Sequence, residues 1–131
     1  MKILIVEDDF VSRLLLKEIL NIYGATETVV NGVEAVEAVR IALEANQPYD
    51  LICLDIMMPQ MDGQEALKRI RSLEKDRGIL SSNGTKVIIV TALDDPKNVF
   101  AAFYGLCDAY LVKPIDRADM IRNLRKLRLI V

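Results

Sequence analysis

The 131-residue sequence contains no histidine, which removes several kinds of chemistry at once. A Ser-His-Asp triad, a histidine metal site and a histidine general base all need an imidazole, so none of them can operate within this chain. Only two cysteines are present, Cys53 and Cys107, and both lie within or beside apolar segments. We expect buried free thiols at both positions, rather than a disulfide or a reactive site.

Strong charge and long apolar runs are also missing. The formal net charge of −2 gives no electrostatic basis for direct binding to nucleic acid. The apolar runs are too short to span a bilayer, and acidic residues interrupt the first run at positions 7–9, so no signal peptide is indicated. We therefore expect a cytoplasmic protein without membrane contact, with a single domain over residues 1–131.

Short apolar runs alternate along the chain with segments of helical periodicity. The runs predict strands at 2–6, 26–30, 51–54, 86–90 and 109–112. Helices are expected from about 11 to 22, from 33 to 43, from 64 to 75, from 96 to 104, and from the capping residue Asp116 to Leu127. A loop is expected over 77–85. This alternation predicts an α/β fold, in which a parallel five-stranded sheet carries helices on both faces.

Four of the predicted strands are followed at once by charged or hydroxyl residues. These residues are Glu7, Asp8 and Asp9, then Asp55, Thr91 and Lys113. Right-handed crossovers bring the carboxyl ends of parallel strands to one edge, where open α/β sheets bind ligands. Carboxylates without histidine or thiolate suit a hard cation such as Mg²⁺. Asp8 and Asp55 are the best candidates for its ligands.

Thr91 and Lys113 indicate a second ligand at the same edge. An ammonium and a hydroxyl beside a metal-bound carboxylate can neutralise and hydrogen-bond the oxygens of a phosphoryl group. Attack by a carboxylate on phosphorus gives an aspartyl phosphate. Asp55 is the expected nucleophile because it follows the central strand.

The segments that carry these residues resemble the receiver domains of two-component signalling, and most of all the single-domain, CheY-like response regulators. The resemblance rests on four segments in the family's order: residues 3–9 (ILIVEDD), 55–63 (DIMMPQMDG), 90–92 (VTA) and 110–114 (YLVKP). It covers nearly the whole chain. The implied fold is the flavodoxin-like (βα)5 type, a doubly wound sheet in a three-layer α/β/α arrangement.

The resemblance implies a metal centre around the acceptor. Asp55 matches the residue that takes a phosphoryl group from the phosphohistidine of a sensor kinase or phosphotransfer protein. Mg²⁺ would be bound by Asp8, by Asp55, by the main-chain carbonyl of Met57 and, through water, by Glu7. Asp9 falls outside the acidic pair, and we expect it to cap the first helix.

The resemblance also implies a phosphate cradle and a switch. Thr91, Lys113 and the main-chain N–H of Ala92 would hold the phosphoryl oxygens. Tyr110 matches the aromatic residue whose ring turns inward when Thr91 moves to the phosphate. The peptide bond before Pro114 is expected to be cis. The face made by helix 4, strand 5 and helix 5 would then bind an unnamed downstream protein, or pair two copies of the chain.

Other functions remain open at this point. A Mg²⁺-dependent aspartyl-phosphate phosphohydrolase would need a second carboxylate two residues after the nucleophile, where Met57 stands. A flavin or nucleotide binder would need a glycine-rich or hydroxyl-rich phosphate loop after the first strand, where the acidic run would repel phosphate. The chain could also be a receiver cut from a larger DNA-binding regulator, or a degenerate receiver. We expect a phosphoacceptor switch of bacterial origin that does not turn over an external substrate.

Overall fold

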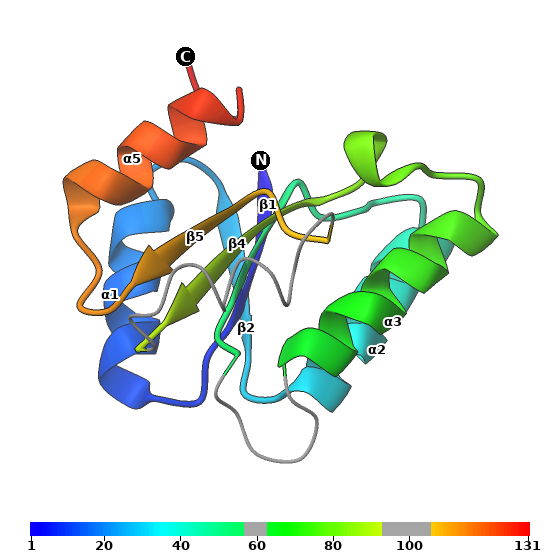
Figure 1. The fold of residues 1–131 in the computed structure, drawn as a ribbon, viewed down its shortest axis with the longest axis horizontal. Coiled ribbons are helices and arrows are strands. Elements are labelled where there is room, and N and C mark those ends of the chain that lie inside the picture. The colour runs from blue at the N-terminus through cyan, green and yellow to red at the C-terminus, as the bar shows by residue number, and fades with distance from the viewer. Residues whose placement is uncertain (57–62, 93–105) are drawn as a thin grey trace.

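A computed structural model describes residues 1–56, 63–92 and 106–131 (Figure 1). The five strands form a parallel sheet in the order β2-β1-β3-β4-β5. The strands are β1 (Lys2–Val6), β2 (Ala25–Val29), β3 (Leu51–Leu54), β4 (Lys86–Thr91) and β5 (Ala109–Val112). The described helices are α1 (Phe10–Leu20), α2 (Gly32–Glu44), α3 (Gly63–Asp76) and α5 (Arg117–Lys126), with a short 3₁₀ turn, η1 (Ser81–Asn83). The helix expected over 96–104 lies outside the described residues.

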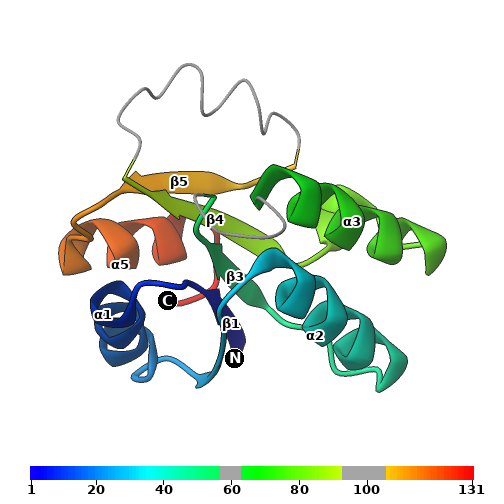
Figure 2. The same cartoon turned by 90° about the horizontal axis from the view of Figure 1, so that it is seen from below.

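Two helical layers enclose the sheet. Figure 2 shows α1 and α5 on one face of the sheet and α2 and α3 on the other. Each face has its own cluster of buried apolar side chains. The strands β1, β3 and β4 are buried almost throughout, because each is covered on both faces. The expected doubly wound α/β fold is therefore confirmed, with β3 at the centre of the sheet.

Polar side chains fix where three helices begin. Asp9 accepts a hydrogen bond from the main-chain nitrogen of Ser12 at the start of α1. Asn31 caps α2 and Asp116 caps α5 in the same way. Such caps supply an acceptor to main-chain N–H groups that the helix itself leaves unbonded. The expected caps at Asp9 and Asp116 are confirmed.

The first helix differs from its prediction at both ends. It ends at Leu20, so Ile22 lies beyond it, and both Ile22 and Val11 are largely exposed. This helix carries apolar side chains on its outer face as well as its inner face, and apolar spacing alone cannot tell the two faces apart. The strands differ less: β2 begins and ends one residue earlier than expected, and β4 includes Thr91.

A glycine sets the distance between α3 and the end of β3. A Cβ atom at Gly63 would lie 2.6 Å from the Cα atom of Ile56, which is closer than real side chains approach. Glycine therefore lets the first turn of α3 lie against the residue that follows Asp55. Helix α3 is held in this way beside the edge of the sheet where the polar residues gather.

Both cysteines are free thiols, as expected. Cys53 is buried in β3, and burial raises the pKa of its thiol to about 12. Cys107 is only half-buried, so the expectation of a buried thiol holds for Cys53 alone. In the described parts of the chain, every helix is too short or too polar to cross a membrane.

Candidate functional site

The ladder between parallel strands places Glu7 and Asp55 side by side. Val6 and Leu54 are paired residues of β1 and β3. Hydrogen bonding continues one residue further, because the main-chain nitrogen of Asp55 donates to the carbonyl of Val6 at 3.0 Å. On the other side of β1, the nitrogen of Glu7 donates to the carbonyl of Val29 at 3.1 Å. Both acidic residues thus have backbones fixed by the sheet.

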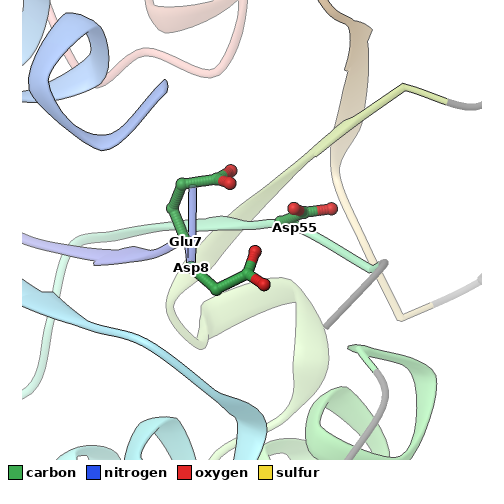
Figure 3. A group of neighbouring side chains, drawn as sticks. All are labelled: Glu7, Asp8 and Asp55. Atoms are coloured by element: carbon green, nitrogen blue, oxygen red, sulfur yellow. The ribbon is translucent and has the colours of Figure 1, made fainter. Parts of the chain in front are cut away.

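Three carboxylates converge at this edge. One oxygen from each of Glu7, Asp8 and Asp55 lies within 4.8 Å of the others, and the side chains of Glu7 and Asp8 both point towards Asp55 (Figure 3). Glu7 is fully buried and Asp55 is 4% exposed, whereas Asp8 is exposed. Buried carboxylates at such separations repel one another unless a cation lies between them.

Lys113 supplies one positive charge to this group. Its Nζ atom donates to Oε1 of Glu7 at 2.9 Å and to Oδ2 of Asp55 at 3.2 Å. The main chain of Lys113 is fixed as well, because its nitrogen donates to the carbonyl of Thr91 at 2.7 Å. The other oxygen of Glu7, Oε2, also lies 2.9 Å from Nζ, but without the geometry of a hydrogen bond. In the part of the chain that the structure describes, a buried carboxylate oxygen is thus left without a hydrogen-bond partner.

The pKa values of Glu7 and Lys113 reflect this imbalance of charge. Burial raises the pKa of Glu7 above its ordinary value of 4.5, and repulsion from Asp55 raises it further, although the hydrogen bond from Lys113 opposes both effects. Burial alone would lower the pKa of Lys113, but the hydrogen bond to Glu7 and the charge of Asp55 leave it raised. Lys113 therefore stays charged, and an excess of negative charge remains around it.

The arrangement fits a hard divalent cation. Among the described residues, the side-chain atoms available as metal ligands are carboxylate oxygens, the group carries more negative than positive charge, and a buried oxygen lacks a hydrogen bond. Mg²⁺ binds such oxygens and keeps part of its water shell, which an exposed position such as that of Asp8 allows. Met57, whose carbonyl was expected to be a further ligand, lies outside the described residues.

The remaining predicted residues lie around this group. Thr91 is buried at the end of β4, and Ala92 follows it at an exposed position. Tyr110 is half-buried and packs against the apolar cluster shared with α2 and α3. The peptide bond between Lys113 and Pro114 is cis. The roles expected for these residues remain predictions.

Sequence reasoning missed one residue at this edge. The guanidinium of Arg13 donates from Nη1 to the main-chain carbonyl of Glu7 at 3.1 Å, and it lies 5.6 Å from the ring centre of Phe10. The bond ties the first turns of α1 to the loop that carries the acidic residues. In the sequence, Arg13 stands four residues after the capping residue Asp9, and that spacing places two side chains on the same side of a helix. This spacing was the signal that could have indicated Arg13.

Comparison with known proteins identifies the family. A model described as "Response regulator receiver domain" matches residues 3–125. The chain therefore belongs to the response regulator receiver domain family, and the resemblance noted from its motifs is confirmed. The solved structures that resemble it include a CheY in the CheX-CheY-BeF3-Mg complex from Borrelia burgdorferi. That chain is 26% identical with a TM-score of 0.82, over 98% of this chain and 89% of the other.

Relatives with this domain differ greatly in length. The two-component response regulator ORR41 of rice is 33% identical over 98% of this chain and 94% of its own length. "Probable histidine kinase 2" of rice is 34% identical over 92% of this chain, but the match spans only 12% of that kinase. The receiver domain of the Arabidopsis thaliana histidine kinase CKI1, solved with Mg²⁺ and BeF3⁻, is 28% identical with a TM-score of 0.82, over 98% and 90% of the two chains.

These comparisons correct one expectation and define the general function. Similar proteins come from plants as well as bacteria, so they do not support the expected bacterial origin. The chain is a receiver domain of the two-component type, homologous to the receivers of histidine kinases and of response regulators. The family acts as phosphoacceptor switches rather than as enzymes that turn over substrate.

Proposed function

We propose that this domain accepts a phosphoryl group on Asp55 from a sensor histidine kinase or a phosphotransfer protein, with Mg²⁺ held beside it. The observation that carries the proposal is the buried carboxylate of Asp55 in contact with Lys113 and within 4.8 Å of two further carboxylates. Asp8 and Asp55 would bind Mg²⁺, Glu7 would act through water, and the carbonyl of Met57 would be a further ligand. The presence of Mg²⁺ in similar receivers supports this assignment.

In the proposed transfer, an oxygen of Asp55 forms a bond to phosphorus as the bond from phosphorus to the donor imidazole breaks. Bound Mg²⁺ would supply positive charge to the phosphoryl oxygens. The ammonium of Lys113, already aimed at Asp55, neutralises part of the charge that arrives. Thr91 and the main-chain N–H of Ala92 complete the cradle, because Thr91 is the last residue of the neighbouring strand β4 and Ala92 follows it.

The signal then depends on contacts that exist only in the phosphorylated state. A phosphoryl group can shift a conformational equilibrium only by binding one state better than the other. Contacts of the phosphoryl oxygens with Thr91 and Lys113 supply that difference, and the half-buried ring of Tyr110 follows Thr91. The face that includes β5 and α5 would pass the change to a downstream protein or to a second copy of the chain.

The phosphohydrolase alternative is weaker. Hydrolases of that class place a second carboxylate two residues after the nucleophile, and Met57 cannot move a proton. We therefore expect one phosphoryl group per chain and slow release, rather than steady turnover.

Phosphorylation with acetyl phosphate and Mg²⁺ tests the proposal, followed by intact-protein mass spectrometry. The wild type should gain a single phosphoryl group, and Asp55→Asn should gain none while keeping its circular dichroism spectrum. Asp9→Asn is the matched control, because it makes the same chemical change in the same region and asparagine also caps helices well. Its labelling should equal that of the wild type.

Labelling that survives in Asp55→Asn would place the acceptor elsewhere. Release of many equivalents of phosphate per chain, measured with acetyl phosphate in excess, would favour the phosphohydrolase. Beryllofluoride with Mg²⁺ gives a second readout. Its addition should change the fluorescence or the NMR signals of Tyr110 in the wild type and leave them unchanged in Asp55→Asn.

A further inference from the structure

A groove of about 370 Å³ runs along α3 and the loop that follows it, which is the light green segment after α3 in Figure 1. Its lining consists of Lys68, Arg71, Ser72, Lys75, Ile79 and Leu80. None of these residues belongs to the phosphoacceptor site. The loop is the 77–85 segment, for which the receiver function gives no role.

The floor of the groove is rigid. Arg71 is almost fully buried, and its Nη1 atom donates to Oε1 of Glu74 and to the carbonyl of Thr85, both at 2.8 Å. Its Nε atom donates to the carbonyl of Leu106 at 2.9 Å. These bonds tie α3 to the segments that precede β4 and β5. The groove is therefore preformed, and a ligand would not have to order it.

Leu80 forms an apolar end of the groove. This residue is 68% exposed, yet hydrogen bonds hold the backbone on both sides of it. The nitrogen of Ile79 donates to the carbonyl of Glu74 at 3.0 Å, and the nitrogen of Asn83 donates to the carbonyl of Leu80 at 2.9 Å. Gly78 makes the turn possible through its positive φ of 76°. The loop thus presents an apolar side chain from a fixed position.

Two lysines give the groove its charge. Lys68 and Lys75 are exposed, and in the described part of the chain neither has an ion-pair partner. The neighbouring Arg69, by contrast, pairs with Glu65 at 3.0 Å. Lys68 and Lys75 are seven residues apart in the helix, which places them about 10 Å apart along one face. This positive edge belongs to a chain whose net charge is −2.

We propose that this groove binds a short acidic segment of a partner protein, in which a large apolar residue covers Leu80. Two carboxylates pair with Lys68 and Lys75, and Ser72 between them is available for a hydrogen bond. An extended peptide rises about 3.3 Å per residue, so acidic residues three positions apart match the spacing of the lysines. The apolar residue then follows the acid that pairs with Lys75, because Leu80 lies beyond that end of α3.

The probe is a peptide with this pattern, Gly-Glu-Ser-Ser-Glu-Ser-Leu-Gly, titrated into ¹⁵N-labelled protein without any phosphodonor. Chemical shift changes should concentrate at residues 68–80. The charge-reversed variant K68E/K75E should bind at least tenfold more weakly. K17E/K126E is the matched control, because it makes the same charge change at exposed lysines of α1 and α5, and its affinity should stay within twofold of the wild type.

Further variants of the protein and the peptide separate the apolar contribution from the charged one. Leu80→Ser should weaken binding several-fold, and so should replacement of the peptide's leucine by serine, because both remove the apolar contact. A peptide with glutamine in place of both glutamates should lose most of its binding. These results do not depend on Asp55, so Asp55→Asn protein should bind the peptide as the wild type does, whatever the outcome of the phosphorylation experiment.

Three results would overturn the proposal. Equal weakening in K17E/K126E would show diffuse charge attraction, and shifts spread over α1 or α5 would place binding on another surface. Peak shifts at 68–80 that depend on protein concentration without peptide would assign the groove to self-association. Analytical ultracentrifugation of the wild type and K68E/K75E would confirm that last case.

Discussion

The two ends of the sheet both bury charged side chains, but they balance the charges differently. At the amino end, Arg71 bonds to Glu74, to two main-chain carbonyls and to Asp108 at 3.4 Å. The second oxygen of Glu74 accepts from the nitrogen of Thr85 at 2.7 Å. At the carboxyl end, three carboxylates converge, Lys113 contacts those of Glu7 and Asp55, and Oε2 of Glu7 has no hydrogen bond among the described residues.

This difference separates a structural cluster from a site that needs a ligand. A buried polar network whose members are all bonded holds its elements in one arrangement. The packing at the amino end agrees with this, since a Cβ atom at Gly84 would lie 2.4 Å from a carboxylate oxygen of Glu74. A cluster with excess charge and an unbonded oxygen gains stability when a cation arrives. The two ends should therefore respond differently to the loss of a charged side chain and to an added cation.

The largest effect is expected at the amino end. Arg71→Met removes the buried cation from the network, which leaves Glu74 with a buried charge and Asp108 with the longer contact to Lys86 at 3.9 Å. Breaking a buried ion pair from one side costs about 3–5 kcal/mol of unfolding free energy. Urea denaturation measures this loss. Arg69→Met is the control, because its ion pair with Glu65 is exposed and within one helix turn, and its loss should cost about 0.5 kcal/mol or less.

A loss of less than about 1 kcal/mol in Arg71→Met would mean that the network is weaker than its contacts indicate. The comparison between the two ends would then fail, because neither cluster would be a large source of stability. The same conclusion would follow if the residues near Leu106 kept their native chemical shifts in Arg71→Met.

The carboxyl end could be predicted from sequence because each contact there follows from two general rules. Apolar runs that end in a charged residue mark strand ends, and right-handed crossovers bring those ends to one edge. Asp55 and Lys113 are 58 residues apart, yet these rules place both at that edge. The exact bond between Lys113 and Glu7 did not follow, because side-chain rotamers depend on packing that no pattern specifies.

The amino end could not be predicted in the same way. Arg71 and Glu74 stand three residues apart on α3, which indicates a pair on one helix face. Their burial depends on Asp108 and on the carbonyls of Thr85 and Leu106, which are far along the chain and belong to loops. Loop carbonyls leave no mark in a sequence. The exposure of Val11 was missed for another reason, since apolar residues on the outer face of α1 mimic a core pattern.

A smaller effect is expected when Mg²⁺ is added. A ligand that binds only the folded state stabilises it by about 2.7 kcal/mol at a concentration of one hundred times Kd. The wild type should gain this much in urea denaturation, and Asp8→Asn should gain much less because it loses a proposed ligand. Asp76→Asn removes an exposed carboxylate at the end of α3 and should respond like the wild type. An equal gain in all three proteins would show that Mg²⁺ acts on the surface as a whole.

The smallest effect concerns pH in the presence of EDTA. Burial and Asp55 raise the pKa of Glu7 in the folded state, so the folded protein holds this proton more tightly than the unfolded chain does. The stability that this proton contributes is fully present at a pH below 4.5, the ordinary pKa of the carboxyl, and is lost as pH rises through the folded-state pKa. As pH rises, the unfolding free energy of the wild type should therefore fall relative to that of Glu7→Gln. The expected fall is about 1.4 kcal/mol for each unit by which the folded-state pKa of Glu7 is raised.

Asp9 supplies the control of opposite sign. Its bonds with Ser12 lower the pKa of its carboxyl below the ordinary value of 3.8, so its contribution to stability is present above that value and lost as pH falls. Relative to Asp9→Asn, the wild type should gain stability with rising pH, whereas relative to Glu7→Gln it should lose stability. If both difference curves rose with pH, the folded protein would stabilise the charged form of the Glu7 carboxyl rather than its protonated form. The carboxyl end would then hold no excess charge for a cation to neutralise.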